Sequence, residues 1–301
     1  MPTYLHWPIE TATPSTSAAE RWFHAGSNIC LDFHGDPVTA RLVVFSDGNH
    51  HMALETSLQA FRDLHPDVSD IFYATTPPNS LINYLTAGKL HLGNLTLSRL
   101  PDIFISPPNI MDELKQQGFI QSHHPFMQSR GNVLLIRKDN PKHIESIADL
   151  LREDVRLFIS NPETEKASYS VYRNTLLNLA TEEGLHEGSM DKRLSNTNTI
   201  YYGQLIHHRE APQCLYDGLA DVAMVYYHLA LRYTRIFPDI FDFIPLGGDK
   251  TDPHPSPNNL TTPYHIGLLG NGGEFGETLL EFMFKDIVTR IYTEHGLQRP
   301  D

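Results

Sequence analysis

Two polar turns follow apolar runs of strand type, and both turns are rich in groups that can donate hydrogen bonds. The run 41–45 (RLVVF) leads into Ser46, Asp47 and Gly48, and the run 71–73 (IFY) leads into the second turn. Hydroxyl and amide side chains occupy that second turn: Thr75, Thr76, Asn79 and Ser80. A helical pattern follows each turn. Two successive strand–turn–helix units predict a parallel sheet with both turns at the carboxyl ends of its strands.

A hydroxyl group and unpaired backbone N–H groups at a helix N-terminus form a workable cradle for an anion. Ser, Asp and Asn are also the usual N-cap residues, so simple capping is the alternative at either junction. Which residue of the second turn would face a ligand stays open, because Pro77 and Pro78 alter the turn and remove two donors.

The 17 histidines include three adjacent pairs, His50-His51, His123-His124 and His207-His208. Adjacent side chains diverge on a helix or a strand, so such a pair seldom gives one ion two ligands. We therefore expect neither a metal site nor a cofactor. If a metal site exists, His50 or His51 is the best candidate, because Asp47 and Glu55 are close in sequence.

The composition excludes several classes of protein. Lys plus Arg is 23 and Asp plus Glu is 36, so the net charge of −13 disfavours nucleic acid as a partner. No apolar run approaches the roughly 20 residues of a membrane span. Two cysteines, Cys30 and Cys214, are too few for a disulfide framework or a thiolate metal site. Motifs of hydrolases, zinc proteases and nucleotide-binding enzymes are absent, so we expect no enzymatic activity.

The middle of the chain predicts the elements that would position these turns. Residues 102–106 (DIFIS) read as a buried strand, 109–117 as a helix that stops at Gly118, and 133–136 (VLLI) as a further strand. The polar run 137–141 (RKDNP) then interrupts the pattern, which is typical of a crossover between two lobes.

This stretch resembles the middle of type II periplasmic-binding-protein-like chains, specifically the molybdate- and tungstate-binding branch. That branch has a D-x-F-I-S strand, a helix with M-D-x-L, and a strand followed by K-D-N-P; the corresponding residues here begin at Asp102, Met111 and Lys138. The resemblance covers residues 40–300 and depends on the order of several short motifs. Residues 89–99 are an insertion relative to it, with the alternation of a β-excursion.

The resemblance adds three candidate ligand-binding residues from the second half of the chain. Ala167 and Ser168 stand, after an N-P-E-T turn, where many relatives have Ala-Gly at the start of a helix. Tyr226 matches a tyrosine that ends a strand in relatives and can offer its hydroxyl to the oxyanion. A half-buried structural aromatic is the alternative for Tyr226.

We predict a two-lobed α/β fold of the type II periplasmic-binding-protein-like class, in which each lobe is a mixed, mostly parallel sheet flanked by helices. Two crossover strands would join the lobes. The expected ranges are an N-terminal arm at 1–39, lobe one at 40–133 plus 265–301, and lobe two at 134–264.

The predicted function is capture of a small oxyanion, molybdate or tungstate before others, in a cleft between the lobes. Neutral donors suit such a ligand, because they replace its hydration without burying a counter-charge. The resemblance implies a monomer that presents its ligand to an ABC permease. Residues 1–27 contain no signal-peptide pattern, so the chain as written predicts a cytoplasmic protein, or an exported one if a leader was removed. The alternative function is an intracellular ligand sensor or a transition-metal-binding accessory protein on the same fold.

Overall fold

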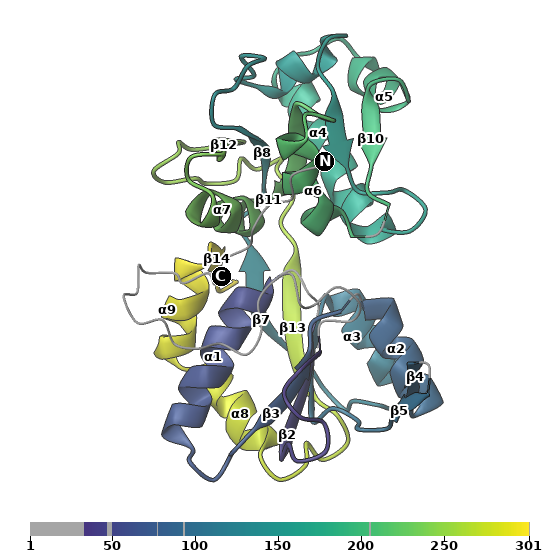
Figure 1. Ribbon diagram of the computed structural model, residues 1–301, viewed down its shortest axis with the longest axis vertical. Helices are drawn as coiled ribbons and strands as arrows, with labels where there is room; N and C mark the ends of the chain where they lie inside the picture. Colours follow the sequence, from purple (N-terminus) through teal and green to yellow (C-terminus); the bar gives the residue numbers. More distant parts are fainter. Residues whose placement is uncertain (1–32, 47–49, 77, 93, 205, 301) are drawn as a thin grey trace. The chain divides into compact units, whose positions relative to one another are not determined.

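The chain divides into two compact α/β units, which are described separately (Figure 1). The computed structural model describes residues 33–46, 50–76, 78–92, 94–204 and 206–300. Lobe one comprises the described residues up to 128 together with 263–300, and lobe two comprises 129–262. Most of the predicted arm, residues 1–32, lies outside the described residues.

The described part of lobe one contains a seven-stranded sheet in the order β1-β3-β2-β6-β13-β7-β14. Its strands are β1 (Phe33–His34), β2 (Leu42–Ser46), β3 (Ile71–Ala74), β6 (Ile103–Ser106), β7 (His124–Ser129), β13 (Pro263–Leu268) and β14 (Leu297–Gln298). β3, β2 and β6 are parallel neighbours. β1 is antiparallel to β3, and β13 is antiparallel to both β6 and β7. The parallel part of the sheet thus consists of three adjacent strands, β3, β2 and β6, each of which is followed by a helix.

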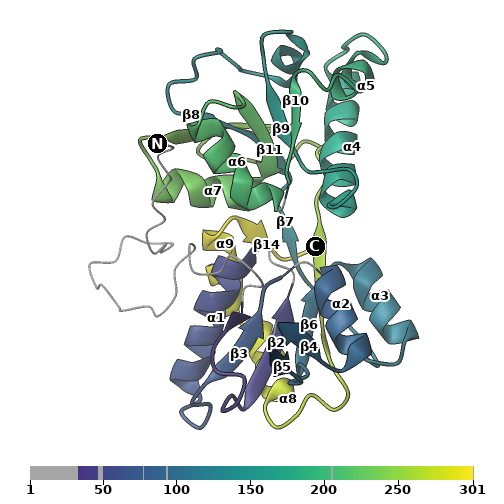
Figure 2. The ribbon, with the colours of Figure 1, turned by 45° about the vertical axis from the view of Figure 1, so that its right-hand side comes forward.

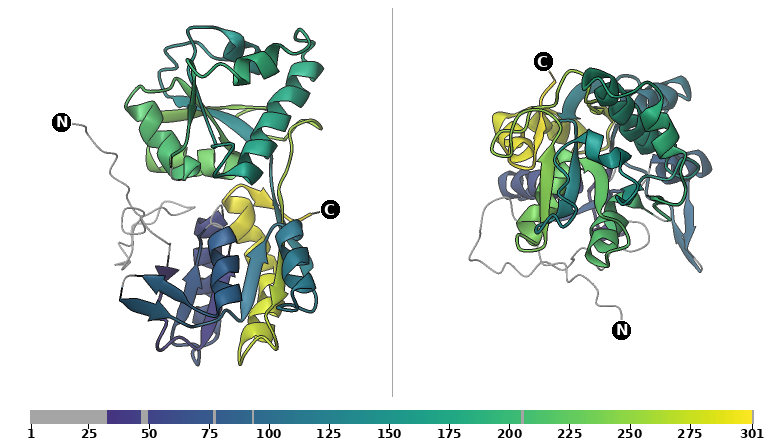
Figure 3. Two further views of the ribbon diagram at one scale, coloured as in Figure 1. Left: turned by 90° about the vertical axis from the view of Figure 1, so that its right-hand side faces the viewer. Right: turned by 90° about the horizontal axis from the view of Figure 1, so that it is seen from above.

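Helices cover both faces of this sheet, because successive strand residues point to opposite sides. Leu42 and Val44 of β2 pack in one core cluster with three helices: α1 (His51–Leu64), α8 (Gly276–Met283) and α9 (Asp286–Glu294). Val43 and Phe45 pack in the other cluster, with α2 (Pro78–Ala87) and α3 (Pro108–Gln116). Figures 1 and 3 show the yellow C-terminal helices beside the purple α1.

The last helical segment differs from the sequence prediction. Apolar spacing predicts one helix from Gly276 through Ile291, but the structure breaks it into α8 and α9. Lys285 is extended, with ψ of 155°, and acts as the N-cap of α9. The apolar residues on the two sides of the break keep nearly the spacing of one continuous helix. The sequence pattern alone therefore does not reveal the break.

Lobe two has, among the described residues, a five-stranded sheet in the order β10-β9-β11-β8-β12. Its strands are β8 (Asn132–Arg137), β9 (Leu157–Ile159), β10 (Ile200–Tyr202), β11 (Val222–Tyr226) and β12 (Phe241–Pro245). Its helices are η3 (Ile147–Leu151), α4 (Lys166–Glu182), α5 (Ser189–Leu194), α6 (His207–Tyr216) and α7 (Tyr227–Ile236). Figure 2 shows α4 on one side of the sheet and α6 with α7 on the other.

The first crossover lies earlier in the chain than the sequence predicts. β8 contains the run 133–136 and pairs antiparallel with β11 and β12, so it belongs wholly to lobe two. The chain enters lobe two at residue 129, before β8, and leaves it at 262. An apolar run reports that a strand is buried but not in which sheet, which explains the shift of five residues from the predicted start at 134.

Residues 89–99 contain the β-excursion that their alternation predicts. β4 (Leu90–Leu92) and β5 (Leu95–Leu97) form an antiparallel two-stranded sheet of their own in lobe one. None of the described helices is long and apolar enough to cross a bilayer.

Candidate functional site

The central strands of lobe one create a topological switch point. α1 follows β2 onto one face of the sheet, whereas α2 follows β3 and α3 follows β6 onto the other face. In open sheets of this kind, ligands bind in the crevice outside the carboxyl ends of the strands where the helices diverge. The carboxyl end of β2 is therefore the expected position for a ligand in lobe one.

Hydroxyl side chains gather at this carboxyl edge. Ser46 ends β2, Thr75 follows the last residue of β3, and Ser106 ends β6. Phe45 is opposite Ala74 and Ser46 is opposite Ile105, so the three hydroxyl residues lie within one residue of the same level. All three are at most 2% exposed. The structure thus places two predicted residues, Ser46 and Thr75, at one end of the sheet, and Ser106 ends the neighbouring strand at the same level.

Ser106 is the residue that the sequence analysis missed. Its side chain is fully buried, and its Oγ atom has no hydrogen-bond partner among the described residues. Leaving a buried hydroxyl unpaired costs about 1–3 kcal/mol, so such a group is a candidate for a ligand contact. Its sequence signal is its position at the end of the DIFIS run, a position that by itself indicates only where the strand ends.

The remaining lobe-one candidates lie in the turns that follow β3 and β2. Thr76 is 3% exposed, and Ser80 is half-buried in the first turn of α2. Asn79 lies in α2, but its side chain is outside the description, as are Asp47 and Gly48 altogether.

His50 lies in the core of lobe one. Its Nε2 atom is 3.2 Å from Ser46 Oγ, and its Nδ1 atom is 3.1 Å from Tyr292 Oη. The ring also packs against Tyr264, with centroids 4.8 Å apart. Burial lowers the pKa of His50 to about 3, so the imidazole is neutral. His51 is the first residue of α1 and is half-buried.

The described residues contain no group of three or more His, Cys, Asp or Glu side chains that could hold a metal ion. Three such residues form a hydrogen-bond chain in lobe one: His123 Nδ1 lies 2.7 Å from His265 Nδ1, and His123 Nε2 lies 3.1 Å from Asp112. These nitrogens face each other as hydrogen-bond partners, which leaves no common point between them for an ion.

In lobe two, the predicted residues Ala167 and Ser168 lie in the first turn of α4. Ala167 is exposed and Ser168 is half-buried. The Ser168 hydroxyl lies 2.9 Å from Ser160 Oγ and 3.1 Å from the Glu165 carbonyl oxygen. The N-cap residue, Glu165, makes no side-chain cap, so the N–H groups of the first turn keep the orphan character of a helix N-terminus.

Tyr226 ends β11 at the same edge of the lobe-two sheet. β11 and β9 are parallel, with Val222 opposite Leu157, so Tyr226 and the segment after β9 lie at neighbouring carboxyl ends. The tyrosine is 3% exposed, and its hydroxyl accepts a hydrogen bond from Thr262 Oγ1 at 3.2 Å. Thr262 thereby holds the phenol in place.

Two carboxylates also lie in this region of lobe two. Glu165 accepts hydrogen bonds from the backbone N–H groups of His207 (3.0 Å) and Asn161 (3.4 Å), and Glu210 accepts one from Gln204 (2.9 Å). Burial raises the pKa of Glu165, and the charge of Glu210 adds to the rise. The N-terminus of α6 is thus capped by an internal anion. Among these two helices, α4 is the one whose N-terminus can serve an external ligand.

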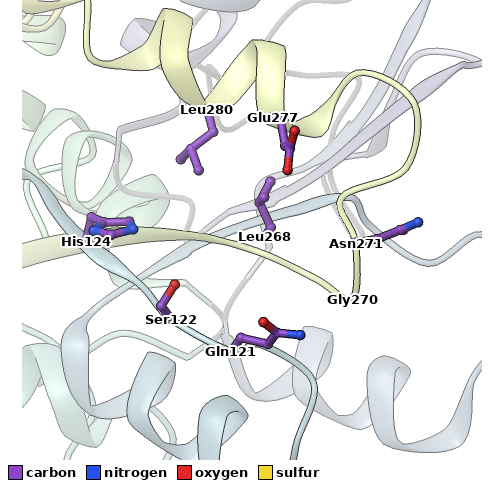
Figure 4. A pocket seen from close by; sticks show the side chains of 8 residues that line it. All are labelled: Gln121, Ser122, His124, Leu268, Gly270, Asn271, Glu277 and Leu280. Atoms are coloured by element: carbon purple, nitrogen blue, oxygen red, sulfur yellow. The ribbon is translucent and has the colours of Figure 1, made fainter.

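A pocket of about 390 Å³ lies elsewhere in lobe one (Figure 4). Its lining combines polar side chains with Leu268 and Leu280. The polar residues are Gln121, Ser122, His124, Asn271 and Glu277. Leu268 is opposite Ile103, the first residue of β6, so the pocket is at the end of the sheet away from Ser106. None of the predicted ligand-binding residues lines it.

A family model described as "Bacterial extracellular solute-binding protein" matches residues 42–298. The match includes every described candidate residue. No curated protein sequence matches the chain significantly.

Solved structures share the fold at low sequence identity. The periplasmic molybdate-binding protein of Azotobacter vinelandii is 16% identical, with a TM-score of 0.60 over 86% of this chain and 100% of that one. The sulfate-binding protein SubI of Mycobacterium tuberculosis is 16% identical, with a TM-score of 0.61 over 86% and 87%. L-phospholactate-bound PEB3, a Campylobacter jejuni protein, is 12% identical, with a TM-score of 0.61 over 86% and 100%.

Proposed function

The chain belongs to the bacterial extracellular solute-binding protein family, and from this premise we propose that it captures a small tetrahedral oxyanion, with molybdate and tungstate as the first candidates. It is a solute-binding protein of two-lobed α/β fold and not an enzyme. The family assignment is shown by the match, whereas the identity of the solute is our proposal.

The observation that carries the proposal is that three buried hydroxyl residues lie at the carboxyl ends of adjacent strands, at the switch point of lobe one. Ser46, Thr75 and Ser106 supply neutral donors, and one of them has no partner among the described residues. A dianion with acceptor oxygens on all sides is the ligand that such donors suit, since neutral groups replace its water without a buried counter-charge.

Lobe two supports the same chemistry with a second set of donors. The first turn of α4 offers orphan N–H groups near Ala167 and Ser168, and Tyr226 offers a phenol hydroxyl held by Thr262. We propose that each set contributes donors to oxyanion capture. The similar structures include proteins whose names state molybdate, sulfate or L-phospholactate, and all three ligands carry a tetrahedral oxyanion group.

The partner in this proposal is an ABC permease that receives the ligand from a monomeric binding protein. The family description, that of an extracellular solute-binding protein, supports this assignment. A pull-down with the permease, compared with and without ligand, tests it.

Thermal-shift and calorimetric titration test the ligand. Molybdate, tungstate, sulfate, phosphate and L-phospholactate are compared with Zn²⁺, Mn²⁺ and Fe³⁺. A selective ligand raises the apparent stability by about 2.7 kcal/mol at 100 times its Kd. We expect a shift with at least one oxyanion and a loss of affinity in both Ser46→Ala and Ser168→Ala. A shift with a metal ion alone contradicts the proposal and favours the metal-binding alternative.

A further inference from the structure

A hydrogen-bond chain leads from the core of lobe one to Ser46. Tyr292 Oη lies 3.1 Å from Nδ1 of His50, and Nε2 of His50 lies 3.2 Å from Ser46 Oγ. The tyrosine comes from α9, at the far end of the sequence, and both rings are shielded from solvent. A neutral imidazole has one donor and one acceptor nitrogen, so the chain has a direction.

Tyr292 determines that direction. Burial raises its pKa, so the phenol keeps its proton, and His50 Nδ1 is the hydrogen-bond partner of its hydroxyl among the described residues. If Nδ1 carried the imidazole proton, the buried O–H group of Tyr292 would have no acceptor there. Tyr292 therefore donates to Nδ1, and the proton of the neutral His50 is on Nε2.

The Nε2–H group then donates to Ser46 Oγ. Because the serine oxygen accepts from the ring, the serine's own proton is directed to an acceptor other than His50. With the opposite tautomer, Ser46 would donate into the ring and would present a lone pair to an anion instead. The chain thus keeps the Ser46 proton out of the imidazole ring, which is the condition for Ser46 to donate to a bound ligand.

We propose that His50 is a positioning residue that holds the Ser46 hydroxyl as a hydrogen-bond donor to the oxyanion, with Tyr292 selecting the tautomer. This inference rests on the proposed function, since it assigns the ligand contact to Ser46. Beyond the proposed function, His50 and Tyr292 are assigned an indirect effect on the affinity for the oxyanion, although neither would contact it.

Two substitutions of His50 separate the role of Nε2 from that of Nδ1. The amide nitrogen of His50→Gln reaches the place of Nε2 and preserves the donor to Ser46, whereas His50→Asn reaches only the place of Nδ1. With molybdate, or whichever oxyanion the titration selects, we expect the Gln variant to stay within about threefold of the wild-type Kd. We expect the Asn variant to lose about tenfold, the effect of one hydrogen bond to a charged group.

A double-mutant cycle shows whether His50 acts through Ser46. In a Ser46→Ala background, His50→Asn should cause no further loss of affinity. Tyr292→Phe should weaken binding by about threefold, because the tautomer is no longer selected. Tyr84→Phe is the matched control: Tyr84 is 1% exposed in the same lobe and donates to the Arg99 carbonyl at 3.0 Å, and its loss should leave the Kd unchanged.

Nitrogen-15 NMR of labelled histidine reads the tautomer without any ligand. We expect the His50 proton on Nε2 from pH 5.5 to 8, and a mixture of tautomers in Tyr292→Phe. A proton on Nδ1 overturns the inference, as do additive losses in the double-mutant cycle. If the wild-type protein binds no oxyanion, the proposed function fails and with it the role of Ser46, while the NMR result still decides the direction of the chain.

Discussion

Two buried serines differ in the hydrogen bonding of their hydroxyl groups. Ser106 Oγ has no partner among the described residues, whereas Ser129 Oγ accepts the backbone N–H of Thr262 at 2.8 Å. Both side chains are 0% exposed. Removing an unpaired polar group and removing a paired one have opposite expected effects on stability.

Ser106→Ala should leave the stability unchanged or raise it by up to about 1 kcal/mol, because a buried hydroxyl without a partner is lost. The same change should weaken oxyanion binding by about tenfold if Ser106 contacts the ligand. Urea denaturation and calorimetric titration measure the two effects. The control Ser129→Ala should cost about 1–3 kcal/mol, since it orphans the Thr262 N–H. A marked loss of stability in Ser106→Ala would show that its hydroxyl is paired.

His207 is a second buried histidine, in lobe two, and it links stability to pH. Its ring stacks on Phe158 with centroids 5.0 Å apart, and burial lowers its pKa from 6.5 to about 3. The unfolded chain therefore binds a proton that the folded chain does not, between pH 6.5 and pH 3. The contribution of His207 to stability is fully present above pH 6.5 and is lost as the pH falls.

His207→Gln should flatten the decline of the unfolding free energy below pH 6.5 by up to about 1.4 kcal/mol per pH unit. Urea denaturation between pH 4.5 and 8 measures the slope. The exposed His186→Gln is the control variant. Equal slopes in the wild type and in His207→Gln would contradict the assignment of a neutral His207.

The sequence indicates that His50 lies beside the first turn, but it does not indicate the role of His50. A histidine before a helix can face a ligand, a metal or the core, and the choice depends on where the helix begins. α1 begins at His51, which turns His50 toward Tyr292, a residue 242 positions later in the chain. Contacts at such separation leave no local pattern in the sequence.

At the scale of elements, continuous apolar runs were the dependable signal. β2, β3 and β6 are buried along their whole lengths and read as unbroken apolar segments, which predicted them within a residue or two. Residues 183–216 are mostly polar, and their pattern predicts no helix or strand. They contain α5, the three-residue edge strand β10 and α6, whose stability comes from tertiary packing more than from local preference.

Asn259 ties the segment before the second crossover to β8 of lobe two. Its side-chain oxygen accepts from Asn132 N at 2.8 Å, and its nitrogen donates to the carbonyls of Asn132 and Leu246, both at 2.9 Å. Gly131 permits this approach: its φ is +74°, and a Cβ there would lie 2.9 Å from the Asn259 amide. The segment is thus fixed to the strand by one buried amide.

Asn259→Ala should destabilise lobe two by about 2–4 kcal/mol, because it leaves several buried backbone groups unpaired. The neighbouring Asn258 is exposed and donates to Glu182 at 3.0 Å, so Asn258→Ala should change stability by less than about 0.5 kcal/mol. Urea denaturation followed by circular dichroism compares the variants. Similar losses in both would show that the buried network does not hold the segment.

At the scale of the whole molecule, a protein with a net charge of −13 is proposed to capture an anion. Local donors can provide affinity, but the long-range field opposes the approach of the ligand. Charge and site chemistry therefore act on different quantities, the association rate and the dissociation rate.

The association rate of sulfate or molybdate should rise by roughly twofold to fivefold between 20 and 200 mM salt, because screening weakens the repulsion. The dissociation rate should change little. Stopped-flow fluorescence measures both, with sucrose as a control for viscosity. A rate that falls with salt would indicate a local positive field at the site, contrary to neutral donors.

The discontinuity of lobe one has a consequence for how the protein is made. Lobe two is a single stretch, 129–262, whereas β13, which lies between β6 and β7 in the sheet of lobe one, is synthesised after all of lobe two. During synthesis, lobe two can complete its core first. Until β13 is made, the edges of β6 and β7 that pair with it lack their partner strand. We therefore expect the part of lobe one before residue 129 to be the segment that a chaperone for nascent strands would protect, although this segment emerges first.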